Sequence, residues 1–199
     1  MRLIKSGFHP KMSKDNFIHL KRKAYSKEFC HALIGFFDLN TTLHTDGISG
    51  NGVYHNIKKD KEICLDLSNG WSEIKTPLLE CINEYKKIYP GIDSSLPKWS
   101  LDSSCQLMRY EPGDAYWAEH CEDDTIKFGR AKRIFAWMAY LNNIDEGGGT
   151  RFTHQKFTTK PREGDLYIWP AGWTHLHKGM VAPKESKYIL TGWFSYAND

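Results

Sequence analysis

The chain has 199 residues, of which 40% are hydrophobic and 14% aromatic, and its formal net charge at pH 7 is +3. This length and composition suit one folded domain with a substantial core and exclude a disordered chain. The small charge argues against binding to nucleic-acid phosphates, and no apolar run approaches the ~18 residues that a membrane-spanning helix needs.

Two helices are predicted in the first half of the chain. The first covers Tyr25 to Phe37, with Ser26 as its N-cap and apolar side chains at every fourth position. The second covers Trp71 to Tyr89, places apolar side chains on one face and stops before Pro90. Between them, the polar and Gly-rich stretch from His44 to Lys61 predicts a loop or an irregular hairpin.

Short runs rich in β-branched and aromatic residues, separated by turn residues, fill the second half of the chain. They predict strands at Cys105–Tyr110, Arg133–Leu141, Lys156–Thr159, Asp165–Trp169 and Lys187–Tyr196. Helices followed by many short strands favour a mainly β fold, a jelly roll with N-terminal helices packed against one side. We expect one domain over residues 1–199, with helical support over about residues 1–100 and the β core over about residues 101–199.

His120, Glu122 and His177 form the first candidate site. In an extended segment, residues two apart point to the same side, so the first two side chains can converge on one ion while Asp123 points away. A surface histidine beside an acidic loop would give the same pattern. His175 competes for the third position, but the ten-residue spacing to a later lysine favours His177, leaving His175 to orient a ligand or line the pocket. Two imidazoles and one carboxylate can cap one face of an octahedral Fe(II), leaving positions for a chelating 2-oxo acid and O2.

Lys187 opens the most strand-like run of the chain, and alternation places Ile189, Thr191 and Trp193 on its face. A lysine on an apolar face must reach solvent or meet a buried anion, because an unpaired buried charge is very costly. The far carboxylate of a 2-oxo acid is such an anion, with Thr191 as a further hydrogen-bond partner and Trp193 as a wall. The hydroxyl of Tyr110 can bind the same carboxylate, although an exposed lysine and a core tyrosine fit the pattern equally well.

The sequence around these residues resembles the 2-oxoglutarate- and Fe(II)-dependent dioxygenases of the prolyl 4-hydroxylase-like branch, and is most similar to short members from marine bacteriophages. The resemblance runs from about Tyr25 to the C-terminus. The phrases that carry it are Arg109-Tyr110-Glu111-Pro112-Gly113, His120-Cys121-Glu122, Tyr140-Leu141-Asn142 with Gly148-Gly149-Thr150-Arg151-Phe152, Gly164 to Pro170, and His177 through Lys187 to Trp193. It implies a double-stranded β-helix, a jelly roll with the metal inside one end.

By motif matching, the resemblance implies that His120, Glu122 and His177 are the catalytic iron ligands. It also implies that Lys187 binds the C5 carboxylate of 2-oxoglutarate and that Tyr110 helps to bind this cofactor. The implied cofactors are Fe(II), 2-oxoglutarate and O2, with ascorbate as a stimulant. The implied reaction hydroxylates a C–H bond, that of a prolyl residue in a peptide or protein, and releases succinate and CO2.

Two features depart from the family pattern. Most members have Asp where this chain has Glu122, and the gap from Tyr116 to His120 is one residue longer than in the collagen-type enzymes. The longer gap alters the mouth of the site, so a collagen-like substrate preference is not implied. Candidate pocket walls are the aromatic residues Tyr116, Trp117, Trp169 and Trp173, and candidate lids are residues 44–61 and 121–132.

Three other functions remain open: hydroxylation of a free amino acid or other small molecule, oxidation of nucleic-acid bases, and a non-catalytic β-barrel binding protein with a lapsed metal site. Lys187 argues against base oxidation, because the demethylases of that kind hold 2-oxoglutarate with Arg. The intact ligand set argues against a lapsed site. We expect a peptide or protein substrate as partner, no membrane and no nucleic acid. Five cysteines without a C-x-x-C pair, and an N-terminus without the apolar core of a secretory signal, predict a cytoplasmic protein, in the host cytoplasm if it is viral.

Overall fold

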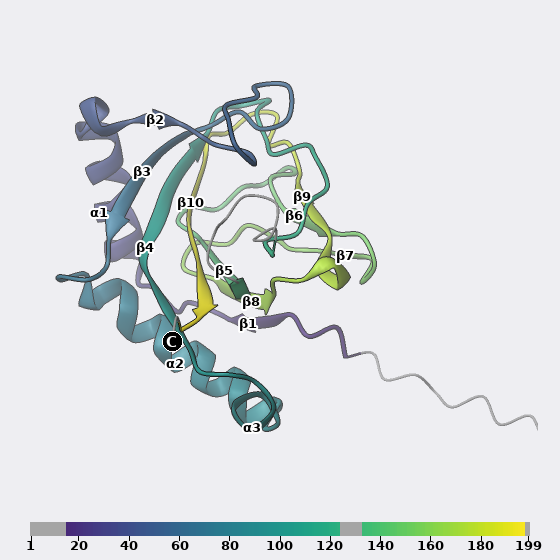
Figure 1. Cartoon of the computed structure of the whole chain (residues 1–199). Helices are drawn as coiled ribbons and strands as arrows, with labels where there is room; N and C mark the ends of the chain where they lie inside the picture. The colour runs from purple at the N-terminus through teal and green to yellow at the C-terminus, as the bar shows by residue number, and fades with distance from the viewer. Residues whose placement is uncertain (1–14, 124–132, 198–199) are drawn as a thin grey trace, which may run out of the picture.

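The computed structural model describes residues 15–123 and 133–197, and in this part of the chain the fold is mostly β-sheet with few helices. Two antiparallel sheets face each other (Figure 1). In spatial order, the larger sheet consists of β1 (His19–Lys21), β8 (Leu166–Pro170), β5 (Arg133–Tyr140), β10 (Lys187–Tyr196), β4 (Trp99–Tyr110), β3 (Lys61–Asp66) and β2 (Thr45–Asp46). The smaller sheet consists of β7 (Phe157–Thr158), β6 (Thr150–Phe152) and β9 (His177–Gly179).

Helices α1 (Lys27–Leu39) and α2 (Ser72–Ile88) cover the face of the larger sheet that points away from the smaller one (Figure 1). Both predicted helices are confirmed within two residues at each end. The Ser26 hydroxyl accepts a hydrogen bond from the Phe29 N–H and so caps α1, as predicted. The remaining helical turns are η1 (Thr41–Leu43), α3 (Ile92–Ser95) and η2 (Trp173–His175). Among the described residues, we find no helix with the length and apolar character that crossing a membrane requires.

The predicted strands of the second half are present, and β10 has the predicted bounds. The sequence pattern did not predict β6 and β9, which have three residues each, nor the contribution of the first half to the larger sheet. There β1, β2 and β3 add strands at both edges, within the region expected to hold only helical support and a loop. Strands β1, β2, β6 and β9 have only two or three residues, too few to show an alternating pattern, so they depend on pairing with their neighbours.

Strand β10 lies in the middle of the larger sheet, between β5 and β4. Alternation sends its side chains in turn to two separate clusters. Leu190 and Phe194 belong to the core beneath the helices, together with Leu33 of α1 and Leu78 of α2. Ile189 belongs to a second cluster between the two sheets. The helix-covered face therefore stabilises the sheet, while the opposite face is available for a site.

The pairing of β10 with β4 contains a bulge. Gly192 pairs with Cys105, but Phe194 pairs with Leu101, so β4 has two more residues than β10 in this interval. A Cβ at Gly192 would lie 2.8 Å from the Trp137 indole, which explains why a residue without a side chain stands here. Both strands keep their alternation through the bulge.

Candidate metal centre and its pocket

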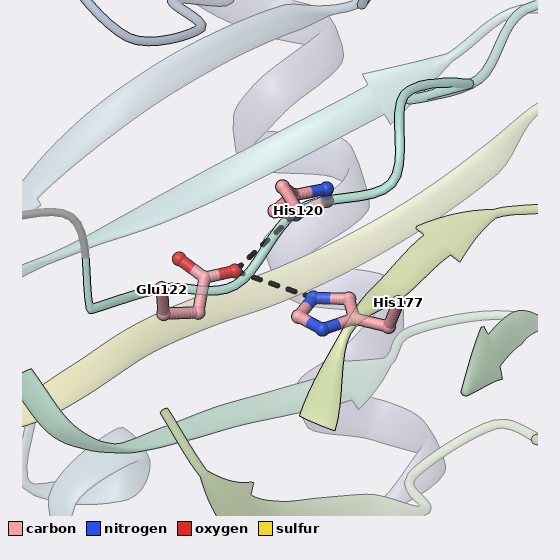
Figure 2. A group of neighbouring side chains, drawn as sticks. All are labelled: His120, Glu122 and His177. Atoms are coloured by element: carbon pink, nitrogen blue, oxygen red, sulfur yellow. Dashed lines mark ion pairs between the residues drawn. The ribbon is translucent and has the colours of Figure 1, made fainter. Parts of the chain in front are cut away.

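Three side chains from two segments of the chain meet between the sheets. His120 and Glu122 lie on the segment after β4, and His177 begins β9 (Figure 2). Glu122 Oε1 lies 3.4 Å from His120 Nε2 and 3.3 Å from His177 Nε2. Three ligands at right angles and ~2.1 Å from one ion would be ~3 Å apart, so one ion can bind all three with little movement. The structure thus brings together the three predicted ligands, which among the described residues form the one group of this kind.

Backbone contacts fix both histidines. His120 and His177 exchange two backbone hydrogen bonds, with N···O distances of 3.0 and 2.9 Å. The Nδ1 of His120 lies 3.0 Å from the carbonyl of Ala118, and the Nδ1 of His177 lies 2.8 Å from the carbonyl of His175. A carbonyl can only accept, so each Nδ1 carries the hydrogen and each Nε2 presents a lone pair to the site. Tyr116 stacks on the His120 ring, with ring centroids 3.8 Å apart.

The two oxygens of Glu122 have different neighbours. Oε1 faces the histidines, whereas Oε2 accepts a hydrogen bond of 2.8 Å from Trp193 Nε1 and lies 3.4 Å from Arg133 Nη1. Burial alone would raise the pKa of Glu122, but the contacts of its carboxylate with the His120 and His177 rings outweigh this effect and hold the pKa well below its usual range. The carboxylate is therefore ionised at neutral pH, as a metal ligand must be.

A cavity of about 390 Å³ opens beside these ligands. Lys187, Ile189, Thr191 and Trp193 all line it, which confirms the predicted common face of the last strand. This volume lies within the usual range for small-molecule sites.

Lys187 is 3% exposed, and its Nζ lies 4.4 Å from the centre of the Tyr110 ring. Burial lowers the pKa of Lys187 to about 8, although the negative charge of Asp60 acts in the opposite direction. Among the described residues, no carboxylate oxygen lies within 4.0 Å of this ammonium. The buried end of the cavity therefore holds a cation without a close anionic partner.

Tyr110 is also buried, and within the described part of the chain its hydroxyl makes one long contact of 3.8 Å, to the sulfur of Met108. Burial, reinforced by the charges of Asp60 and Glu62, raises the pKa of Tyr110 well above its usual range. The hydroxyl thus keeps its hydrogen and can donate it to a carboxylate beside Lys187.

The structure gives two candidate residues contacts that differ from the expectation. The Thr191 hydroxyl donates a 2.7 Å hydrogen bond to the carbonyl of Trp137, so in this arrangement its hydrogen is not free for a cofactor carboxylate. Trp193 lines the cavity as expected, but its N–H is directed at Glu122. Neither contact could be predicted from strand alternation, which gives the face of a side chain and not its partner.

His175 lies outside the ligand group. Its Nε2 is 3.0 Å from the carbonyl of Asn16 and its Nδ1 is 3.0 Å from the Thr174 hydroxyl. Burial lowers its pKa, which favours the neutral ring. Only the backbone carbonyl of His175 reaches the site, where it contacts His177.

Of the four candidate aromatic walls, Tyr116 and Trp169 line the cavity. Trp117 does not line it, and Trp173 is 71% exposed on another part of the surface. The candidate lid at residues 44–61 contributes cavity-lining residues, Ile48 among them. Most of the other candidate lid, residues 121–132, cannot be compared, because its positions after 123 lie outside the described residues.

A buried charged group near the cavity was not predicted. Lys58 Nζ lies 3.2 Å from Asp60 Oδ2 and 3.1 Å from Glu62 Oε2, and Lys58 is 4% exposed. Burial raises the pKa of Asp60 to about 6, although the positive charge of Lys58 acts against this rise. The sequence signal that could have revealed this group is the spacing of Lys58, Asp60 and Glu62. Charged residues at every second position of a segment that enters a strand point to one face. Lys58 and Glu62 line the cavity that Lys187 also lines.

Comparison with known proteins places this site in a family context. Residues 105–195 match the 2OG-Fe(II) oxygenase superfamily. Over 118 residues, 47% of this chain, the sequence is 26% identical to a protein of Arabidopsis thaliana named "Probable prolyl 4-hydroxylase 9". The match covers 41% of that plant protein, so the chain spans less than half the length of this curated relative.

Solved structures resemble the fold over most of the chain. A Pseudomonas putida prolyl-4-hydroxylase has a TM-score of 0.67 at 18% identity, with 90% of this chain and 92% of that chain covered. The viral collagen prolyl hydroxylase of Paramecium Bursaria Chlorella virus-1, in its 2OG complex, has a TM-score of 0.64 at 18% identity, with 94% and 99% covered. A Trichoplax adhaerens prolyl hydroxylase in complex with a hypoxia inducible factor peptide has a TM-score of 0.68 at 16% identity, with 90% and 84% covered. At these identities the likeness shows the fold.

The matched superfamily, the prolyl 4-hydroxylase relative and the group of two histidines and one glutamate agree with one another. Together they indicate a site suited to Fe(II) and 2-oxoglutarate, the two species in the name of the matched superfamily.

Proposed function

We propose that this protein is a Fe(II)- and 2-oxoglutarate-dependent oxygenase that hydroxylates a prolyl residue of a peptide or protein. The observation that carries the proposal is the position, in one cavity, of the ligand group and of the Lys187 ammonium, which among the described residues has no close carboxylate. A cofactor with a chelating end and a distant carboxylate is complementary to both. The two sheets on either side of this cavity support the interpretation of the fold as a double-stranded β-helix.

Each residue of the site has a separate task in this reaction. His120 and His177 offer their Nε2 lone pairs and Glu122 offers Oε1 to the iron, which when bound couples O2 activation to the decarboxylation of 2-oxoglutarate into succinate and CO2. Lys187 binds the C5 carboxylate by its charge, and Tyr110 donates a hydrogen bond to the same group. The apolar side chains of Met108 and Ile189 line the cavity and limit the access of water.

A prolyl substrate is supported by the named relatives. The plant relative and the similar solved structures are called prolyl hydroxylases, and one of those structures holds a peptide. Tyr116 and Trp169 give the cavity aromatic walls that can pack against a pyrrolidine ring. We propose the short bacteriophage enzymes as the most similar members, a single domain over the chain and a cytoplasmic location on the basis of the sequence resemblance and composition alone.

Turnover with and without substrate tests this function. We expect the purified protein, given Fe(II), 2-oxoglutarate and ascorbate, to form succinate, detected by proton NMR. In a library of proline-containing peptides, mass spectrometry should find products heavier by one oxygen atom, with hydroxyproline after hydrolysis. The same assay is run on free L-proline and on single-stranded DNA. Product from free proline alone would replace the peptide substrate but keep the oxygenase, and the absence of succinate under all conditions would contradict the oxygenase itself.

A further inference from the structure

The contacts of Glu122 distinguish its two oxygens. Oε1 lies between the two histidines, at 3.4 and 3.3 Å from their Nε2 atoms. Oε2 accepts from Trp193 Nε1 at 2.8 Å and lies 3.4 Å from Arg133 Nη1. We propose that Arg133 and Trp193 are positioning residues that hold Oε2 and so make Glu122 a single-oxygen metal ligand. This inference rests on the proposed function, because it presumes that the site binds a metal.

Arg133 and Trp193, here called the clamp, also contact each other. The guanidinium carbon lies 3.5 Å from the centre of the indole ring, a stacked cation–π arrangement. Arg133 begins β5 and Trp193 lies on the neighbouring β10, where it pairs with Ala136. The Arg133 side chain is 13% exposed. The clamp is therefore built on two central strands and is partly shielded from solvent.

Glu122 itself lies on an irregular segment and needs such support. Its backbone N–H donates to the carbonyl of Ala171 at 2.9 Å, and its own carbonyl lies 3.5 Å from Arg133 Nη1. These contacts fix the backbone but leave the side-chain torsions free. A glutamate has one more of these torsions than an aspartate, so ordering its carboxylate costs more conformational entropy. The clamp offsets this cost by holding Oε2 in one place.

The position of the clamp also fits the length of the Glu122 side chain. Shortening the side chain by one methylene would withdraw the carboxylate by ~1.5 Å. From there it could keep its contacts with Trp193 and Arg133 or its approach to the histidines, but not both. The length of the Glu122 side chain and the position of the clamp are thus matched. Replacing Glu122 with aspartate should therefore weaken metal binding in this chain.

Metal binding without turnover tests the proposal. The purified protein is titrated with Co(II), with calorimetry for affinity and the visible absorption of bound Co(II) for ligand geometry. Trp193→Phe removes the N–H and keeps a ring for stacking, and Arg133→Gln removes the cation. Each should weaken Co(II) binding about 10- to 100-fold and alter the absorption bands. Trp173→Phe and Arg151→Gln, at exposed positions outside the cavity, serve as matched controls and should bind as the unmodified protein does.

Glu122→Asp completes a double-mutant cycle. In the unmodified protein, Glu122→Asp should weaken Co(II) binding by at least about tenfold. In the Trp193→Phe/Arg133→Gln variant the same substitution should weaken binding by clearly less, because the contacts with the clamp that Glu122→Asp disturbs are already lost. Circular dichroism of the metal-free proteins verifies folding, and each single variant tests the proposal independently if another does not fold. Unchanged affinity and spectra in folded Trp193→Phe and Arg133→Gln, or additive effects in the cycle, would overturn the clamp. Failure of the unmodified protein to bind Co(II) would overturn the proposed function as well.

Discussion

Lys187 and Tyr110 are cross-strand partners on β10 and β4, and the ammonium of the lysine lies 4.4 Å from the centre of the tyrosine ring. The ring face offers a buried cation some of the stabilisation that water would give, but less than a full counter-ion does. The arrangement favours the entry of an anion that satisfies the ammonium and the phenolic O–H together.

Lys187→Ala should weaken 2-oxoglutarate binding while leaving metal binding nearly intact. Loss of one partner of a buried charge pair typically costs ~2–5 kcal/mol, so the dissociation constant should rise by at least about 30-fold. Calorimetry with Mn(II) in place of iron measures both affinities. Lys184→Ala is the matched control, because that side chain is 77% exposed and pairs with Glu146. Equal 2-oxoglutarate affinity in the two variants would assign the cofactor carboxylate to another cation.

The affinity for 2-oxoglutarate should fall as the pH rises through about 8. Burial lowers the pKa of Lys187 to about 8, and only the protonated ammonium attracts a carboxylate. The cofactor site is therefore charged below this pH and loses its charge above it, which predicts about tenfold weaker binding at pH 9 than at pH 7. Lys187→Arg supplies the comparison, because a guanidinium keeps its charge throughout this range. A similar pH dependence in both proteins would show that Lys187 is not the titrating group.

The two neighbouring histidines should differ in their effect on metal binding. His177→Ala removes an Nε2 ligand and should reduce Co(II) affinity by more than about 100-fold. His175→Ala should retain one bound ion per chain, because only the backbone carbonyl of His175 reaches the site. Both side chains are 4% exposed, so the pair is matched for burial. Equal losses in the two folded variants would contradict the assignment of His177 as the ligand.

Gly47→Ala should destabilise the protein by about 1–3 kcal/mol, the usual cost of overpacking. A Cβ at Gly47 would lie 2.0 Å from Asp60 Oδ1 and 2.5 Å from Lys58 Nζ, and so would displace the buried ion pair. Gly35→Ala is the opposite control. Gly35 lies within α1, and apart from the adjoining residues and backbone of that helix nothing lies within 4 Å of the added Cβ, so alanine should stabilise by about 0.5–1 kcal/mol. Urea unfolding measures both changes, and equal stability of the two variants would contradict the prediction.

Elements with a long pattern are predicted with accurate bounds. Strand β10 alternates over ten residues and was predicted at both ends, and the capped amphipathic α1 was placed within two residues. Strands β1 and β2, with three and two residues, show no period of their own. They depend on partners such as Ile168 of β8 and Glu62 of β3, which only the folded chain brings near.

The candidate site likewise contains residues that the sequence predicts and residues that only the folded structure shows. The ligand group and Lys187 could be predicted, because the alternation of a strand and the spacing of the family motifs can both be recognised within short stretches of sequence. Arg133 could not, because its relation to Glu122 requires two segments to meet in space and no local pattern records this contact. The burial of Lys58 was also missed, since a charged residue in a polar stretch ordinarily lies on the surface, although the alternating charged positions indicate that these side chains share one face.

The bulge between β4 and β10 indicates which insertions and deletions in β4 the cavity wall can accept. Asp102 and Ser104 occupy the interval of β4 opposite Trp193, and both line the cavity. Removing or adding two residues there leaves every following side chain on its original face, whereas a change of one residue would exchange the cavity face for the helix-covered core. Loop grafting or evolution can therefore remodel this wall in even steps while Tyr110 and Lys187 keep their register at the other end of the strands.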